Sequence, residues 1–208
     1  MIKTELIPVI HMVNHNQVVT NVKTCIECGI NKIFLINHVV PIEDLIKCAL
    51  FIKKEYNIWV GINMLGQTTE MSLLLDIDLD AIWCDAEVRD HSFSRNFKGT
   101  FFGGLAFKYQ PKPKDLKKSC EWSVLTTDVS TTSGPATGKE ASIDKILEIK
   151  KYVGEHPLAI ASGVSIDNIR KYKGIVNYLL VASSITSFGE IIIKDSLINL
   201  KNELEENG

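Results

Sequence analysis

The sequence predicts a (β/α)8 barrel, an α/β fold in which parallel strands close into a cylinder surrounded by helices, as one domain spanning residues 1–208. Three observations predict it. Short apolar runs alternate with stretches of helical periodicity along the whole chain. The alternation repeats about eight times at roughly 26 residues a unit, which a strand, a helix and two short loops require. No linker or low-complexity segment interrupts the series.

The first four units are predicted within residues 1–98. Residues 7–13 form an apolar run too short for a helix, whereas Val18, Val22 and Cys25 share one helical face. Gly29 ends that helix, and Pro41 suits the first turn of the next one. The strands of this half are predicted at 7–13, 32–36, 58–64 and 81–85. The helices are predicted at 17–28, from 41 onward and at 68–75, with a weak helix or loop at 91–98.

The last four units contain one ambiguous stretch. Residues 114–120 favour helix and residues 122–127 favour strand, so we place a helix first, ending near Leu125. The strands of this half are predicted at 100–107, 128–132, 157–161 and 178–182. The later helices are predicted from Ser142 or Asp144 to Tyr152, at 166–172 and at 195–205. An open doubly wound sheet is the rival fold, but the G-x-G-x-x-G fingerprint is absent after the first strand.

The composition limits the partners and the location of the protein. The chain is 45% hydrophobic and 23% charged, so it can bury a core and is not globally disordered. A formal net charge of -2 argues against nucleic acid as a partner. No apolar run is long enough for a signal peptide or a membrane span, so we expect a cytoplasmic protein without a membrane partner. Five scattered cysteines fit reduced thiols.

Polar residues stand at the carboxyl ends of the predicted strands, where barrel enzymes carry their active sites. His11, Asn37, Asn63, Asp85 and Lys108 follow or end the first five strands in turn. The last three loops are instead rich in glycine and small hydroxyl residues, namely Ser133, Gly134, Thr137, Gly138, Ser162, Gly163, Ser183 and Ser184. Glycine lets backbone amides converge on an anion, and hydroxyl groups add donors without bulk. Tight turns and helix caps use the same residues, but two adjacent loops of this kind favour a phosphate site.

Six segments, in this order and spacing, resemble the strand ends of the BtpA family: KIFLINH, IWVGINMLG, IWCDAEV, FFGGLAFKYQ, TTSGPATG and IASGVSIDNI. The resemblance covers roughly residues 7–185, and SGPATG at 133–138 is its most specific element. More distantly, the chain resembles phosphoribosylanthranilate isomerase and other ribulose-phosphate-binding barrels. These resemblances imply a phosphate-binding TIM barrel whose family reaction is poorly defined.

The chain also departs from both patterns. It has residues 11–16 where BtpA members carry a proline-rich loop, and it lacks the cysteine that serves the isomerase as general base after strand one. A role in photosystem I biogenesis or in tryptophan synthesis is therefore not transferred to it.

Three residues are the catalytic candidates. Lys108 at the barrel mouth can polarise a carbonyl, form a Schiff base or hold a phosphate, although Lys112 and Lys114 nearby also suit a solvated loop. Asp85 can serve as a general base or bind ribose hydroxyls, and His11 can act as an acid or base. Asn63 lies between apolar neighbours, so its amide needs partners that a ligand or the next strand can supply.

The leading hypothesis is an enzyme that binds a small phosphorylated metabolite, a sugar phosphate or nucleotide, and reacts by acid and base chemistry of the isomerase, lyase or nucleosidase type. No cofactor is predicted for it, and a divalent metal stays open. A second hypothesis is a metal-assisted hydrolase, but the spacing of its candidate ligands matches no metal signature: His11, His15, His38, Asp85 and Glu87. A third is a non-catalytic phospholigand-binding or assembly factor of the BtpA type. Barrels of this size often dimerise, so a homodimer stays open.

Overall fold

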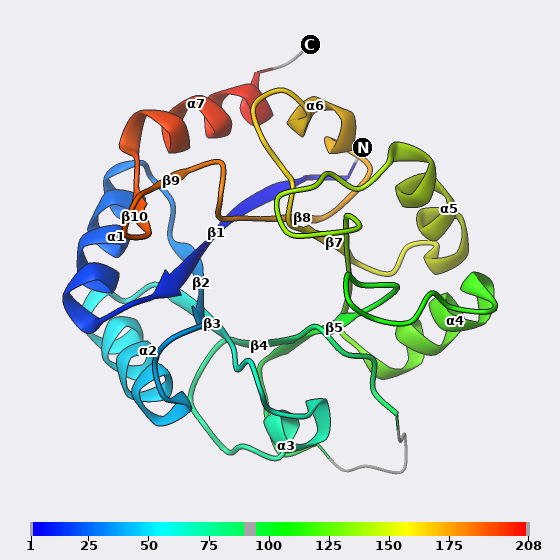
Figure 1. The fold of residues 1–208 in the computed structure, drawn as a ribbon, viewed down its shortest axis with the longest axis horizontal. Helices are drawn as coiled ribbons and strands as arrows, with labels where there is room; N and C mark the ends of the chain where they lie inside the picture. Colours follow the sequence, from blue (N-terminus) through cyan, green and yellow to red (C-terminus); the bar gives the residue numbers. More distant parts are fainter. Residues whose placement is uncertain (1, 90–94, 207–208) are drawn as a thin grey trace.

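The computed structural model describes residues 2–89 and 95–206, which form a closed barrel of parallel strands (Figure 1). The order of strands around the barrel is their order along the chain, and β1 pairs with β8 to close it. The barrel strands are β1 (Glu5–Met12), β2 (Lys32–Asn37), β3 (Trp59–Asn63), β4 (Ala81–Cys84), β5 (Thr100–Gly104), β6 (Val129–Ser133), β7 (Leu158–Ala161) and β8 (Tyr178–Val181). The predicted fold class is therefore confirmed.

Helices surround the barrel, as the periodicity predicts (Figure 1). They are α1 (His15–Glu27), α2 (Ile42–Tyr56), α3 (Thr69–Leu73), α4 (Leu116–Thr126), α5 (Ile143–Val153), α6 (Ile169–Tyr172) and α7 (Lys194–Glu205). Side-chain caps fix where several helices begin. The Asn14 carboxamide oxygen accepts the Gln17 N–H at 2.9 Å at the start of α1, and Ser142 caps α5 in the same way. No helix in the described part of the chain is long and apolar enough to cross a membrane.

The apolar side chains form two layers. The outer layer lies between strands and helices, and it buries the α1 face of Val18, Val22 and Cys25 completely. The inner layer fills the barrel with aromatic rings, in which Phe34 makes edge contacts with Trp83 and Phe102. This packing closes the lower part of the barrel and leaves the carboxyl ends of the strands as the place for a site.

An antiparallel hairpin, β9 (Thr186–Ser187) and β10 (Ile191–Ile192), follows β8 and lies beside α1 (Figure 1). The sequence does not predict it, because strands of two residues carry no alternating pattern. The hairpin is fixed to α1 by the buried Asn21, whose side-chain oxygen accepts the Ile192 N–H at 2.9 Å. It brings a further segment of the chain to the rim of the barrel.

Several element ends differ from their predicted positions. β5 stops at Gly104 rather than at 107, because the chain turns at Ala106, where φ is 46°. α6 is a single turn rather than the predicted 166–172, since the Asn168 side chain accepts the Ser165 N–H and forms a turn before it. Of the weak helix or loop predicted at 91–98, residues 91–94 lie outside the described residues.

Candidate functional site

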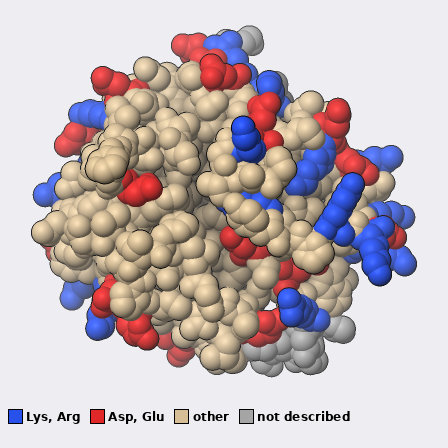
Figure 2. Space-filling view, viewed as in Figure 1, with Lys and Arg blue, Asp and Glu red and all other residues tan. Residues whose placement is uncertain are grey.

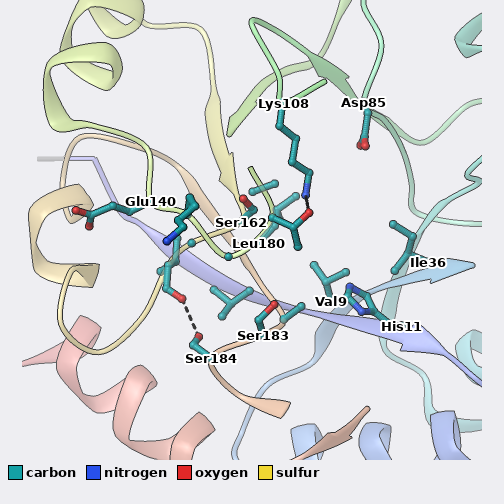
Figure 3. A pocket seen from close by; sticks show the side chains of 18 of the residues that line it. Val9, His11, Ile36, Asp85, Lys108, Glu140, Ser162, Leu180, Ser183 and Ser184 are labelled. Carbon is teal, nitrogen blue, oxygen red and sulfur yellow. Dashed lines mark hydrogen bonds between the residues drawn. The ribbon is translucent and has the colours of Figure 1, made fainter. Parts of the chain in front are cut away.

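A cavity of about 620 Å³ opens at the carboxyl ends of the strands (Figure 3). Its walls come from both ends of the chain, because the closed barrel brings the loop after β1 beside the loop after β8. The predicted site residues that line it are His11, Asp85, Lys108, Thr137, Gly138, Ser162, Gly163, Ser183 and Ser184. The space-filling view shows Lys and Arg gathered over the side of α4 and α5, with few of them over the side of α1 and α2 (Figure 2).

The other predicted site residues lie behind this lining. The Asn37 side chain accepts the Leu65 N–H at 2.8 Å and so joins the loops after β2 and β3. Asn63 is 2% exposed, and its Nδ2 donates to the Asp85 Oδ1 at 3.0 Å. The Ser133 hydroxyl accepts the Lys108 N–H at 2.7 Å. A Cβ at Gly134, the fourth of these residues, would collide with a backbone carbonyl. In this structure all four hold neighbouring segments in place.

The loops after β6, β7 and β8 are tied closely together. Ser162 and Gly163 have φ values of 76° and 75°, and a Cβ on Gly163 would collide with the Lys139 carbonyl group. Glycine is required at this position, because only a residue without a side chain fits both the backbone angle and the close approach. The Ser184 hydroxyl donates to the Val164 carbonyl at 2.7 Å and joins the last two loops.

Four backbone N–H groups at this end of the cavity make no hydrogen bond within the described residues: those of Gly163, Val164, Ser183 and Ser184. The Ile185 N–H closes a turn on the Ala182 carbonyl at 3.0 Å, which leaves the two central amides of that turn open. Unpaired amides in adjacent turns concentrate positive partial charge, and they suit an anion such as phosphate.

Titratable side chains occupy the rest of the mouth. Burial raises the pKa of the Asp85 carboxyl group, whereas the Asn63 hydrogen bond and the charge of Lys108 act in the opposite direction. Figure 3 shows Asp85 and His11 standing apart from Ser184 across the cavity. A buried carboxyl group with a raised pKa binds a proton more tightly than a free one does, and such perturbed groups are typical of general acids and bases.

Lys108 is held from both its backbone and its side chain. Its Nζ donates to the Thr137 Oγ1 at 3.1 Å and lies 5.8 Å from the ring centre of Tyr109. Below it, the Lys145 Nζ donates to the carbonyl groups of Ala106 and Ser133, both at 2.7 Å, and burial lowers the pKa of Lys145. These contacts place the Lys108 amine at the cavity wall rather than in free solvent.

The histidines separate into two groups. His11 lies 4.6 Å from His38 between ring centres, and its Nδ1 is 3.3 Å from the Glu190 Oε2. Burial is the main reason that the pKa of His38 is lowered. His15 instead packs against Phe51 at 4.7 Å. Within the described residues, no group of three or more His, Cys, Asp or Glu side chains is arranged to hold a metal ion.

Sequence reasoning misses Tyr109, which lines the cavity, and Glu190, which contacts the lining residue His11. Tyr109 is 79% exposed, and its hydroxyl lies 3.1 Å from the Thr137 Oγ1. It follows Lys108 directly, but a single tyrosine in a polar loop carries no distinguishing signal. Glu190 belongs to the hairpin after β8, and that unpredicted hairpin alone brings it to His11.

The fold and the cavity together define a TIM barrel with a candidate site at the carboxyl face of its strands. No protein-family model matches the sequence, and no curated protein matches it either.

Solved structures with the same fold are similar over nearly the whole chain. One described as native KDPGal has a TM-score of 0.72 at 10% identity and covers 99% of this chain and 96% of its own. Orotidine 5'-phosphate decarboxylase from Pyrococcus horikoshii OT3 has a TM-score of 0.71 at 9% identity, and the match covers 98% of this chain and 100% of that one. Phosphoribosyl anthranilate isomerase from Thermus thermophilus has a TM-score of 0.64 at 9% identity, and the match covers 97% of this chain and 98% of that one. At these identities the likeness establishes the fold alone.

Proposed function

We propose that the protein is an enzyme acting on a small phosphorylated metabolite, whose phosphate is bound by the loops after β7 and β8. The observation that carries this proposal is the set of open amides of Gly163, Val164, Ser183 and Ser184. Amides fixed by tied loops need no reorganisation to receive an anion, so they bind it better than mobile donors do. The names of the structural neighbours agree with it, because two of them refer to phosphate or phosphoribosyl substrates.

The reaction we propose is proton transfer at a carbon or heteroatom of the bound metabolite, of the isomerase, lyase or nucleosidase type. Asp85 and His11 are the candidate acid and base, because both are titratable side chains that line the cavity and stand apart from Ser184 (Figure 3). Lys108 is the candidate electrophile, since its amine can stabilise negative charge that develops on a carbonyl oxygen. Asn63 orients the Asp85 side chain and Thr137 orients the Lys108 side chain, each through a hydrogen bond.

A non-catalytic factor of the BtpA type is the second candidate. The quoted strand-end motifs are the observation that favours it, and it uses the same phosphate loops. The two candidates differ in one property, because a binding factor retains its ligand unchanged whereas an enzyme converts it.

A thermal-shift screen followed by an activity assay tests the proposal. Sugar phosphates and nucleotides are compared with their dephosphorylated forms, since a ligand that binds the native state alone raises the midpoint of unfolding. The proposal expects stabilisation that depends on the phosphate group, and conversion of the best ligand that Lys108→Ala abolishes. Equal stabilisation without phosphate contradicts the site. Binding without conversion contradicts the enzyme and supports the binding factor.

A further inference from the structure

Glu190 extends from the hairpin to the rim of the cavity and meets His11 of β1. The carboxylate Oε2 lies 3.3 Å from the His11 Nδ1, and both side chains are partly shielded from solvent, at 38% and 21% exposure. No hydrogen bond occupies the His11 Nε2 within the described residues. One ring nitrogen therefore has a charged partner and the other has none.

The backbone at Glu190 is held in a conformation that a residue with a side chain adopts at a cost. Its φ is 58°, in the left-handed region. Two side-chain amides of α1 capture its carbonyl oxygen, those of Gln17 and Asn21, each at 2.7 Å. Both amides belong to buried residues, so little solvent competes for these hydrogen bonds.

Gln17 also holds the backbone at His11 and Val13 in place. The Gln17 Nε2 donates to the His11 carbonyl at 3.2 Å, and its Oε1 accepts the Val13 N–H at 3.2 Å. Gln17 thus connects the backbone of the histidine to the backbone of Glu190. A turn that merely joins β9 to β10 needs none of these contacts to a left-handed glutamate.

We propose that Glu190 is a positioning residue that fixes the proton of His11 on Nδ1 and leaves the Nε2 lone pair free as a general base. The negative charge of a carboxylate 3.3 Å from Nδ1 favours the tautomer that carries its proton on this nitrogen. His38 packs beside the ring at an interplanar angle of 58°. The other titratable side chains that line the cavity are Asp85, Lys108, Tyr109, Lys139 and Glu140. The assignment of a base rests on the proposed function, but the tautomer does not.

Long-range ¹H–¹⁵N correlation spectra of the imidazole rings test the proposal in the ligand-free protein. They are recorded at pH about 9, above the ordinary range of imidazole titration. We expect the His11 signals to show a protonated Nδ1 and a bare Nε2. We expect Glu190→Ala to remove this preference, because no carboxylate then lies beside Nδ1. Glu190→Gly serves as a second variant, since glycine fits the left-handed backbone without strain.

Asp195→Ala is the matched control, because Asp195 is an exposed carboxylate just beyond the hairpin with no contact to His11. It should leave the His11 signals unchanged. The Ile192 amide signal reports whether the hairpin stays bound to Asn21 in each variant. A wild-type His11 protonated on Nε2, or a tautomer unchanged in both Glu190 variants with the hairpin intact, overturns the proposal. A failure of phosphate binding overturns the proposed function instead and leaves this result untouched.

Discussion

The two halves of the barrel mouth are built from different chemistry. The loops after β6, β7 and β8 present backbone amides and small hydroxyl groups, held by short hydrogen bonds between loops. The half formed by β1 to β5 presents most of the titratable side chains, among them Asp85, Lys108, His11 and His38, while Lys139 and Glu140 come from the loop after β6. Backbone amides keep their partial charge at every pH, whereas side chains change theirs, so the first half suits binding and the second suits reaction.

The two halves also differ in what supports them. In the amide half, glycines allow close backbone contacts, such as that of Gly163 with the Lys139 carbonyl. In the titratable half, polar side chains support other polar side chains, as Asn63 does for Asp85. Substitutions that add a side chain should therefore damage the first half, and substitutions that remove a functional group should damage the second.

Asp85→Asn should lower turnover by about 10²- to 10⁴-fold, because the amide cannot transfer a proton. Its hydrogen bond from Asn63 can persist, so the fold should be kept. Turnover of the best phosphorylated ligand is the measurement. The exposed Asp76→Asn is the control and should change nothing. Full activity in Asp85→Asn would show that Asp85 does not transfer a proton in the reaction.

The difference in stability between Asp85→Asn and wild type should depend on pH. Burial raises the pKa of Asp85, so the folded protein holds this proton more tightly than the unfolded chain does. This favourable contribution is fully present at acid pH and is lost as the pH rises through the raised pKa of the folded state. The variant should thus unfold at a higher temperature than wild type at neutral pH, and the gain should vanish at acid pH. A gain that is constant with pH would contradict the assignment.

Gly163→Val should abolish phosphate binding and lower the free energy of unfolding by roughly 3 kcal/mol, from backbone strain and a collision with the Lys139 carbonyl. Denaturant unfolding and a phosphate titration measure the two effects. Gly66→Ala is the control, because its φ is 91° but its Cβ would meet nothing within 4 Å. It should cost only about 1–2 kcal/mol and bind phosphate normally. Equal results for both variants would mean that the close approach at Gly163 does not matter.

Asn21→Ala should lower the free energy of unfolding by about 1–3 kcal/mol, since it leaves the Glu190 carbonyl short of a donor and the Ile192 N–H without an acceptor. Hydrogen exchange of the hairpin amides should speed up more than that of the barrel strands. Unchanged exchange in the hairpin would show that α1 does not hold it.

Ser184→Ala should have the smallest effect, about 1 kcal/mol of stability, because it removes one hydrogen bond to the Val164 carbonyl. Phosphate affinity should fall only severalfold, since the open amides remain. A complete loss of phosphate binding would mean that hydroxyl groups, rather than amides, make the site.

The barrel could be predicted from the sequence because its period is regular and its strands are buried runs. The buried face of α1 lies where helical periodicity places it, and Ser142, one of the two predicted starts of α5, caps that helix. The start of α1 at His15, capped by Asn14, falls two residues before the predicted one. The hairpin could not be predicted, because its two-residue strands depend on Asn21, which is far from them in the chain. Local pattern does not report such a contact.

The candidate site could be predicted only in part, for a similar reason. Strand ends predict which residues reach the mouth, but not whether a side chain is already engaged below it. Asn37 and Ser133 both stand at strand ends, and each accepts a backbone N–H from a neighbouring loop. Glu190 is the reverse case: it was not predicted at the mouth, because the segment that carries it has no pattern that predicts an element, and yet it contacts His11 there.

An amide-resolved NMR titration with inorganic phosphate tests the central claim most directly, because it reads the proposed donors one by one. The account predicts saturable shifts of the Gly163, Val164, Ser183 and Ser184 amide signals, with amides of the distant helices unchanged. Shifts confined to the lysine-rich surface near Lys112 and Lys114, or no saturable shift at those four amides, would contradict it.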